Sequence, residues 1–591
     1  MSKPKVRSKR RPMVRWYDPA QLSKTAVDVL LSTIFGRHAD HRLVEAMAMQ
    51  DKGHTFHPYP KGDAAPPDEF WIDYVADVGD GWHSTFTVAS AIAEKSLELT
   101  APNGEVHTTQ RGSVLVFGGD EVYPTASRRA YEERLIEPYK TAMAHGQGRV
   151  DIFAIPGNHD WYDSLVSFTR LFMSGKAFGG WQPRQERSYF ALRLPHDWWL
   201  LGIDVQLGAS IDVLQLEYFE KIASAHIKPD HGVIICTAEP EWIWEKMYDD
   251  PNKGDDVYTE RTIDDFQMAI FGGRKHRAQV IIAGDLHHYR RHVRTGGGQG
   301  AEHKITAGGG GAFLHPTHRV DVEKIGRTSG MYELAKDGVT GCPAVYPDVK
   351  TSSRLCWRNL AFAWHNPSFM WLSGGLYLLI AMALRVPAPS PSDKAWDWSA
   401  AFETTFWQLV NSPSASFFLI ALIAGFLVFT DTHKRWFRLC AGAAHGIAHL
   451  IAVFFIAWSA TFLALEVQAP RSGGWMFLYY YVWPAVATAL GGALVGSTIF
   501  GSYLLLSLNC FGRHSNEAFS ALGIEDWKNF IRMKIAKDGL TIFPVGIDKV
   551  KRWKLDGEQP ILKSNDHTPP KLIEKPIHVS RPRVPDHGGS V

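Results

Sequence analysis

The chain of 591 residues has few cysteines, and they form no recognisable framework. None lies in a CxxC pair, and their number is odd: Cys236, Cys342, Cys356, Cys440 and Cys510. This pattern argues against a disulfide scaffold and against a zinc ribbon, and it favours a reducing compartment.

An excess of charge of either sign is also missing, since 63 Lys and Arg face 61 Asp and Glu for a net charge of +2. This excludes a globally basic nucleic-acid binder, so we expect no nucleic-acid partner, and it excludes a polyanionic disordered chain. The first residues, MSKPKVRSKRRP, are basic but no apolar run follows them, so we expect no cleavable signal peptide. This arm is either a solvated tail or a contact with an anionic membrane surface.

Long apolar runs are confined to the second half of the chain, between residues 366 and 511. Helices that cross a membrane need about 20 apolar residues. We therefore predict an all-α transmembrane bundle of about four helices, at residues 368–384, 413–430, 441–465 and 474–510. The fourth run is too long for one ordinary span, and it is either one helix kinked at Pro484 or two short spans broken near Gly491 and Gly492.

His445 and His449 stand four positions apart in the third run and so share a helix face. We expect them to hydrogen-bond across the helical bundle, with a metal or haem site as the alternative.

Basic residues flank the runs on one side, which predicts an even number of spans with both chain ends in the cytoplasm. The basic residues are Lys350, Arg354, Arg358, Lys434, Arg435, Arg438, Arg513, Lys528, Arg532 and Lys534. We expect an integral protein of an inner or plasma membrane whose soluble domain faces the cytoplasm.

The remaining chain divides by composition into four parts. Residues 1–65 form a basic arm with a lead-in helix, and residues 66–350 form the main soluble domain. Residues 512–556 are a soluble segment that packs on this domain, and the Pro-rich, polar residues 557–591 are a disordered tail.

Five segments of the main domain share one form, an apolar strand that runs into a short acidic, His or Gly turn. They are WIDYVADVGDG, SVLVFGGDEVY, VDIFAIPGNHD, HGVIICTAEP and AQVIIAGDLHH. Ligands of α/β folds lie at the carboxyl ends of the strands, where Asp, Asn and His side chains suit a divalent or trivalent metal. We therefore expect Asp77, Asp120, Asn158 and His287 to surround a common ion.

Together these segments resemble the calcineurin-like metallophosphoesterases over residues 70–320. Asp77-x-Gly79 and Gly119-Asp120-x-x-Tyr123 are most similar to the purple-acid-phosphatase branch of that superfamily. The resemblance implies an α/β (α+β) metallophosphoesterase β-sandwich flanked by helices.

The resemblance also implies roles for individual residues. Asp77, Asp120, Tyr123 and His287 match the ligands of a first metal, and Asp120 would bridge to a second metal that also takes Asn158. His159 matches the residue that steadies or protonates the leaving oxygen, with Asp160 as its orienting partner. In that family a metal-bound hydroxide attacks phosphorus, and one or two ions of Mn, Fe or Zn serve as the cofactor.

The sequence departs from the family pattern at two positions. Ala238 stands where the fourth segment usually has a His, and Asp285 replaces the first His of the fifth. Both imidazoles would have bound the second metal, so Asp285 becomes a substitute ligand and a carboxylate-rich site favours Mn, Mg or Ca over Zn.

Two further histidines are candidates for substrate contact, His288 beside the fifth segment and His315 in AGGGGAFLHPTH. That glycine-rich stretch is either a tight strand connection or a backbone that approaches phosphate.

The expected function is that of a membrane-anchored metallophosphoesterase, a hydrolase that acts on a phosphoester substrate beside the lipid bilayer. The alternative is a metal-binding pseudo-phosphoesterase that acts as a regulatory or scaffold membrane protein. A transporter or channel is disfavoured, because the apolar runs contain no Asp, Glu, Lys or Arg.

Overall fold

The computed structural model describes most of the chain in two compact units. It covers residues 10–31, 56–62, 65–144, 148–205, 211–248, 261–272, 277–296, 300–318, 321–326, 330–337, 341–384, 398–411, 413–430, 435–466, 478, 482–556, 559–562 and 568–582. The sandwich unit comprises residues 1–14, 24–352 and 523–591, and the helical unit comprises residues 15–23 and 353–522.

The sandwich unit contains two large mixed sheets. The ten-stranded sheet has the order β1-β8-β9-β10-β11-β13-β12-β15-β14, with β16 paired to β12. Its strands are β1 (His57–Pro58), β8 (Phe190–Leu194), β9 (Trp198–Gly202), β10 (Gly232–Thr237), β11 (Val280–Ala283), β12 (Tyr289–Arg294), β13 (His303–Ala307), β14 (Lys324–Ile325), β15 (Tyr332–Leu334) and β16 (Val345–Tyr346).

The eight-stranded sheet has the order β21-β18-β17-β2-β5-β6-β7, with β22 paired to β18. Its strands are β2 (Glu69–Val75), β5 (Val114–Phe117), β6 (Val150–Ala154), β7 (Trp181–Pro183), β17 (Lys528–Ala536), β18 (Gly539–Ile547), β21 (Lys571–Leu572) and β22 (Ile577–Val579). Two separate hairpins join β3 (Ser96–Thr100) to β4 (Val106–Gln110) and β19 (Trp553–Asp556) to β20 (Gln559–Leu562).

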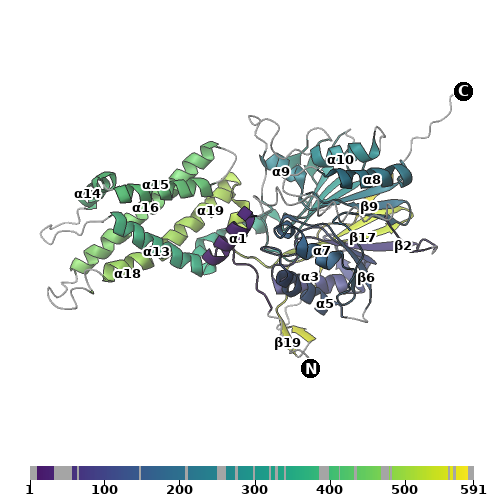
Figure 1. The fold of residues 1–591 in the computed structure, drawn as a ribbon, viewed down its shortest axis with the longest axis horizontal. Coiled ribbons are helices and arrows are strands. Elements are labelled where there is room, and N and C mark those ends of the chain that lie inside the picture. Colours follow the sequence, from purple (N-terminus) through teal and green to yellow (C-terminus); the bar gives the residue numbers. More distant parts are fainter. Residues whose placement is uncertain are drawn as a thin grey trace. The chain divides into compact units, whose positions relative to one another are not determined.

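The two sheets face each other across one apolar core, and helices cover their outer faces (Figure 1). Ile72 and Val116 of one sheet and Ile234 and Ile282 of the other belong to the same buried cluster. The helices of the unit are α3 (Trp82–Ala93), α4 (Arg128–Ala130), η2 (Tyr131–Ile136), α5 (Glu137–Ala142), α6 (Asn158–Trp161), α7 (Val166–Phe172), α8 (Val213–His226), α9 (Glu241–Tyr248) and α10 (Arg261–Phe271). The predicted class is confirmed as mixed α/β with two mixed sheets.

The central strands run parallel, which determines where polar side chains meet. β2, β5 and β6 pair in parallel, as do β9, β10, β11 and β13. These strands are buried along almost their whole length and are mostly apolar, with Asp73 on β2 and Asp151 on β6 as buried exceptions. Further polar side chains follow at the carboxyl ends.

The C-terminal part of the chain completes the smaller sheet. β17 pairs antiparallel with β2, and β18 pairs with β17. The predicted disordered tail at residues 557–591 differs from the structure, which places β20 and residues 568–582 in ordered positions. β20 pairs with β19, and β21 and β22 pair with β18. In the same segment Glu574 forms an ion pair of 2.5 Å with Arg291, and both residues are buried, which composition alone does not reveal.

Two basic residues that were predicted to flank the membrane, Lys528 and Arg532, lie on β17 inside the sandwich unit. Lys528 and Arg532 are fully buried in the sheet, so they do not serve as membrane-flanking charges. The Arg532 Nε lies 2.7 Å from the Asp73 Oδ1 on β2.

We predict that Arg532→Met destabilises the protein by about 3–5 kcal/mol, because it leaves the Asp73 carboxylate buried without its counter-charge. Thermal or urea unfolding of the sandwich unit within the full chain measures this loss. Lys534→Met on the same strand is the matched control. It removes the exposed 3.1 Å pair with Glu69 and should cost about 1 kcal/mol or less. Equal losses in the two variants would contradict the assignment.

The helical unit is built from apolar helices. They are α11 (Val349–Cys356), η3 (Trp357–Ala361), α12 (Phe362–His365), α13 (Pro367–Leu384), α14 (Trp398–Asn411), α15 (Pro413–Phe429), α16 (Arg435–Glu466), α18 (Trp483–Gly491), η5 (Gly492–Gly496), α19 (Ser497–Phe511) and α20 (Ser515–Ser520). α1 (Pro19–Leu31) precedes both sheets in the chain.

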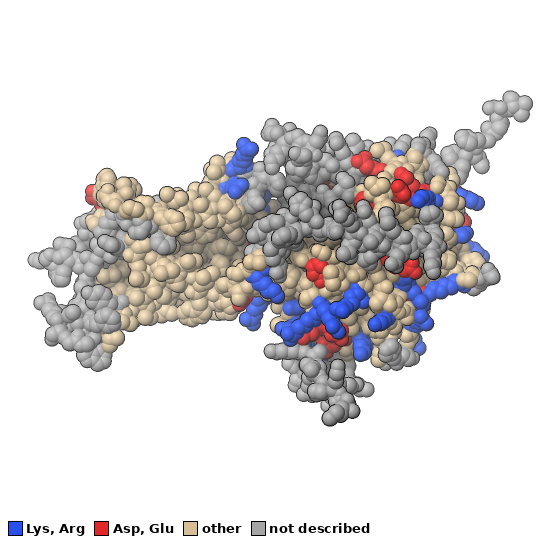
Figure 2. Space-filling model, viewed as in Figure 1, with Lys and Arg blue, Asp and Glu red and all other residues tan. Residues whose placement is uncertain are grey.

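Two helical stretches are long and apolar enough to cross a membrane, at residues 435–461 and 483–511, and shorter apolar helices lie at 367–383 and 420–429. The second stretch runs without a break through α18, η5 and α19, with a π-helical turn at Gly492–Gly496. In Figure 2 the middle of the helical unit shows almost no Lys, Arg, Asp or Glu on the face in view.

Candidate metal centre

Three aspartates directly follow three buried strands in a strained backbone conformation. Asp77, Asp120 and Asp285 follow β2, β5 and β11, and their φ angles are +57°, +54° and +66°. A non-glycine residue in this left-handed region costs about 1–3 kcal/mol, and such residues cluster at functional sites. The local conformation turns each chain sharply at the same edge of the sandwich.

Backbone hydrogen bonds tie these turns to one another. The Asp77 N–H donates to the Gly119 carbonyl at 2.9 Å, and the Val78 N–H donates to the Asp120 carbonyl at 3.0 Å. The Ala312 N–H donates to the Asp77 carbonyl at 2.9 Å. The turns therefore form one rigid platform rather than independent loops.

Three of the predicted ligands converge on the hydroxyl of the fourth. The Tyr123 Oη lies 2.9 Å from Asp77 Oδ1, 3.0 Å from Asp120 Oδ2 and 2.9 Å from His287 Nε2. All four side chains are at least 96% buried. A phenol has one proton, so it cannot donate to all of these partners, and the arrangement has more acceptor atoms than donors.

The ring of His287 is oriented for ligation. Its Nδ1 lies 2.7 Å from the Phe313 carbonyl, so Nδ1–H donates there and Nε2 keeps its lone pair toward Asp77 and Tyr123. The His315 ring stacks on it with a centroid distance of 4.0 Å. Backbone carbonyls hold many metal-binding histidines in this way.

Two glycines are required by the carboxylates that they face. A Cβ atom at Gly308 would lie 2.2 Å from Asp77 Oδ2, and one at Gly157 would lie 2.0 Å from Asp120 Oδ1. The glycine-rich stretch after β13 therefore packs directly against Asp77. Its backbone forms part of the wall of the site.

The charges in this cluster repel each other. Burial, and then the charges of Asp120 and Asp285, hold the pKa of Asp77 well above its usual range. Burial and Asp160 raise the pKa of Asp120 to about 8, and burial and Asp120 raise the pKa of Asp285 to about 7. Burial lowers the pKa of His287 well below its usual value. A bound cation would stabilise the ionised forms of these three carboxylates, which lie close together beside a neutral imidazole.

The first set of donors fits a metal ion. Donor atoms around an octahedral ion with bonds of ~2.1 Å lie ~3.0 Å apart along each edge, which agrees with the three distances from the Tyr123 hydroxyl. The Asp77 Oδ2 is buried and has no hydrogen-bond partner among the described residues. Within those residues, no group of three or more His, Cys, Asp and Glu side chains is placed to hold a metal ion.

The second set of donors is less complete. The Asp285 Oδ2 accepts a hydrogen bond of 2.9 Å from the Trp244 indole, and Asn158 is half-buried with its amide 3.5 Å from the Tyr162 hydroxyl. Ala238 packs against Gly119, where a Cβ atom would meet the Ala238 Cβ at 2.7 Å. This close approach requires a glycine at position 119.

His159 lies beside these turns, and its Nδ1 forms a hydrogen bond with the backbone. Its Nδ1–H donates to the Pro124 carbonyl at 2.6 Å, and its ring lies 4.4 Å from that of Tyr123. The backbone N–H of His159 donates to Asp120 Oδ1 at 2.9 Å. The residue is thus fixed relative to the first set of donors.

Asp160 has a different environment from the one that the sequence suggests. Its Oδ2 accepts from the Gly157 and Glu121 N–H groups at 2.9 and 3.2 Å, and its Oδ1 accepts from the Tyr131 hydroxyl at 2.5 Å. It therefore holds the turn that carries Asn158 and His159. The Pro124 carbonyl is the group that orients the His159 ring.

The two histidines predicted to contact substrate are both buried. His288 is 3% exposed, and neither ring nitrogen has a hydrogen-bond partner among the described residues. His315 is 8% exposed and supports the His287 ring.

Sequence reasoning missed the residues that support the donors: Trp244, Phe313, Pro124 and the buried Glu121. No motif marks them, because a backbone carbonyl or an indole on a separate element acquires its role only when the chain folds.

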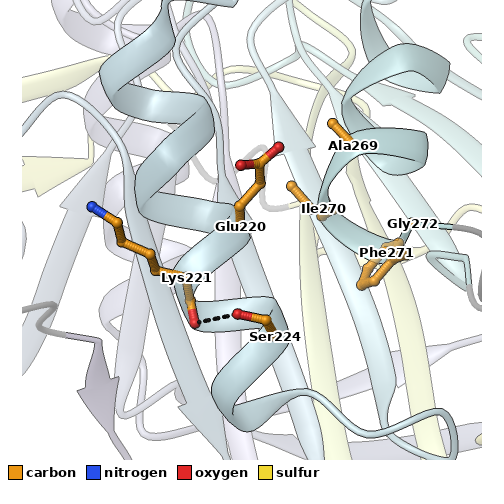
Figure 3. Close-up of a pocket in the computed structure, with 7 residues that line it drawn as sticks. All are labelled: Glu220, Lys221, Ser224, Ala269, Ile270, Phe271 and Gly272. Carbon is orange, nitrogen blue, oxygen red and sulfur yellow. Dashed lines mark hydrogen bonds between the residues drawn. The ribbon is translucent and has the colours of Figure 1, made fainter.

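A surface hollow elsewhere in the unit has no comparable chemistry. It measures about 440 Å³ and lies between α8 and α10, lined by Glu220, Lys221, Ser224 and residues 269–272 (Figure 3). None of these residues lies in the turns that carry the metal donors.

A family model matches the part of the chain that contains these turns. Residues 70–289 match the family described as calcineurin-like phosphoesterase. This part of the chain is a calcineurin-like phosphoesterase domain, as the sequence motifs predict.

Several solved structures are similar to the chain at low identity. The anchor protein GAP50 of the inner membrane complex of Plasmodium is 11% identical, with a TM-score of 0.30, 46% of this chain covered and 83% of that chain. Purple acid phosphatase PPD1 of yellow lupin (Lupinus luteus) is 12% identical, with a TM-score of 0.30, 44% of this chain covered and 46% of that chain. PhoD is 9% identical, with a TM-score of 0.28, 43% of this chain covered and 59% of that chain. The chain thus spans about half the length of those two phosphatase-named structures. No curated protein matches the sequence.

Proposed function

We propose that the chain is a membrane-anchored, metal-dependent phosphoester hydrolase whose sandwich unit faces the cytoplasm. One observation carries the proposal: within a calcineurin-like phosphoesterase domain, Asp77, Asp120 and His287 meet at the Tyr123 hydroxyl. A cluster of this kind, buried and rich in negative charge, suits a cation that in turn binds phosphate.

Asp77, Asp120, Tyr123 and His287 would hold the first metal ion, and Asp120, Asn158 and Asp285 the second. When bound, such ions polarise the phosphoryl oxygens and activate water as a nucleophile at neutral pH. The chain itself contributes the rigid placement of these donors and the exclusion of bulk water from their inner atoms.

His159 assists the leaving group in this proposal. Its Nδ1–H donates to the Pro124 carbonyl, so Nε2 has the lone pair of the neutral ring and must first bind a proton before it passes one to a departing alkoxide. Asp160 acts one step away, because it fixes the turn between Gly157 and His159. His288 and His315 support the site from behind, His315 through the ring of His287.

Membrane anchoring is the second part of the proposal. The stretches at residues 435–461 and 483–511 and the shorter apolar helices of the helical unit support it. Among the described residues these stretches contain almost no acidic or basic side chain beyond Arg435 and Arg438 at one end, which suits an anchor better than an ion pathway.

A second candidate function is that of a metal-binding pseudo-phosphoesterase with a regulatory role. Ala238 and Asp285 favour it, because the second set of donors lacks two imidazoles. The placement of His159 favours the enzyme, since a scaffold has no need for a fixed proton donor beside the metal set.

Hydrolysis assays on the full-length protein in detergent distinguish the two functions. The substrates are an aryl phosphate monoester and a diester, with Mn²⁺, Fe²⁺ or Zn²⁺ supplied and the bound metal counted. We expect turnover of at least one ester, its loss after chelation and its return with metal. A protein that is fully loaded with metal and hydrolyses neither ester would support the pseudo-phosphoesterase.

A further inference from the structure

The helical unit contains an elongated cavity that the phosphoesterase chemistry does not use. Its volume is about 670 Å³, and it lies between α16 on one side and η5 with α19 on the other. On α16 it extends from Trp436 to Ala448, and on the opposite wall from Leu494 to Phe511. At 1.5 Å per residue the walls are roughly 18 to 25 Å long. A cavity of this length suits an extended chain better than a compact molecule.

The walls are almost entirely apolar along this length. Ala444 and Ala448 of α16 face Leu494, Ile499 and Leu506 of the other wall. These apolar side chains offer dispersion contacts and suit a hydrocarbon chain. The polar members of the lining are His445, Thr498, Ser502, Tyr503 and Ser507.

One end of the cavity is flanked by positive charge. The first turn of α16 and the end of α19 meet there, since the rings of Phe437 and Phe511 lie 5.1 Å apart and both residues line the cavity. Arg435 and Arg438 begin α16, and Arg513 follows α19 by two residues. The carboxylate of Glu517 is also near this end, 3.7 Å from His514, so the described charges there sum to an excess of positive charge.

A buried hydrogen-bond chain reaches the cavity wall at His445. The Tyr377 hydroxyl of α13 lies 2.7 Å from His449 Nδ1, and His449 Nε2 lies 3.2 Å from His445 Nε2. His449 therefore hydrogen-bonds to a second helix, whereas His445 bonds to His449 of its own helix.

The direction of these hydrogen bonds leaves the Nδ1–H of His445 without an acceptor among the described residues. A buried phenol that is hydrogen-bonded only to His449 within the described residues donates its proton there. His449 then donates from Nε2, His445 accepts at Nε2, and the remaining proton of His445 is on Nδ1. Among the described residues this Nδ1 is buried and has no partner, although His445 lines the cavity. This nitrogen exposes almost no surface, so it faces packed protein atoms and not the open volume of the cavity.

From these observations we infer that the cavity binds one anionic glycerophospholipid of the surrounding membrane. An acyl chain lies along the apolar walls, and the phosphate faces the end with Arg435, Arg438 and Arg513. This inference rests on the membrane anchoring in the proposed function.

Photochemical labelling tests the inference on the full-length protein in phosphatidylcholine nanodiscs. One sample contains phosphatidylglycerol with a photoreactive acyl chain, and the other contains phosphatidylcholine with the same chain. We expect the anionic probe to label α16 and α19 at least 5-fold more than the zwitterionic probe, saturably and in preference to α13 and α15. Equal labelling by both probes, or labelling spread evenly over all helices, would overturn the inference.

Three variants locate the bound lipid. Ala448→Phe fills the cavity and should lower the labelling at least 5-fold, whereas Ile447→Phe, on an exposed position of α16 outside the cavity, should leave it unchanged. Arg435→Gln is exposed and does not threaten folding, and it should reduce the preference for the anionic probe. Unchanged labelling in Ala448→Phe together with an unchanged preference in Arg435→Gln would refute the site.

The failure of the inference can be told apart from that of the proposed function. Extraction of the chain from membranes by alkaline carbonate would refute the anchoring. A protein that stays in the membrane without selective labelling would refute the lipid site alone. Phosphoester hydrolysis in detergent depends on neither result.

Discussion

Asp120→Asn is expected to lower kcat/KM for an aryl phosphate ester by about 10³-fold or more, because a metal ion contributes several kcal/mol of transition-state stabilisation. Asp120 is the one carboxylate that belongs to both donor sets. Its Oδ2 faces the Tyr123 hydroxyl at 3.0 Å, and its Oδ1 accepts the His159 N–H at 2.9 Å. An amide keeps the shape of the side chain but removes the negative charge that attracts the cation.

The same variant should bind less metal than the parent protein. Steady-state kinetics with saturating Mn²⁺ and metal counting on the same samples measure the two effects together. A large loss of turnover with unchanged metal content would mean that Asp120 acts on the substrate rather than on the ion.

Asp212→Asn is the matched control for this substitution. Asp212 lies in the same unit and accepts the Gln215 N–H at 2.9 Å as the N-cap of α8, a position that asparagine fills equally well. It should therefore leave kcat/KM and thermal stability nearly unchanged. An Asp120→Asn protein with full metal content and full turnover would remove the basis of the proposed function.

Three donors of the first set could be predicted from the sequence because each lies in the turn after a buried strand, whereas Tyr123 was predicted from the family resemblance. Apolar runs before Asp77, Asp120 and His287 mark parallel strands, and the carboxyl ends of such strands meet at one edge. The left-handed conformation of Asp77, Asp120 and Asp285 was not predictable, since aspartate has no strong preference for it outside this packing.

Long-range pairing explains most of what the sequence did not reveal. Composition predicts a soluble segment at residues 512–556 that packs on the main domain, but it does not name β2 as the partner of β17, from which it is separated by 459 positions at the Asp73–Arg532 contact. Glu574 likewise meets Arg291 over a separation of 283 positions. In both cases the counter-charge of a buried residue lies hundreds of positions away in the sequence. Local composition does not predict such a pairing.

The role of His159 can be separated from metal binding by the choice of leaving group. His159→Gln should lower kcat by roughly 10²–10⁴-fold for an alkyl phosphate ester, whose alkoxide needs a proton as it departs. For a nitrophenyl ester, which leaves as a stable anion, the loss should be less than about 10-fold, because protonation contributes little there. The ratio of the two losses is the measurement, and it does not depend on how much active protein each preparation contains.

The hydrogen bond between His159 and the Pro124 carbonyl explains why glutamine should impair proton transfer. The Pro124 carbonyl fixes His159 Nδ1 at 2.6 Å, so glutamine can replace the hydrogen bond but cannot transfer a proton from the other side. His578→Gln, on an exposed position of β22, changes the same residue type in the same unit and should affect neither ester. Equal losses on both esters in His159→Gln would assign the residue to metal or phosphate binding instead, and the leaving group would then depart with a proton from water.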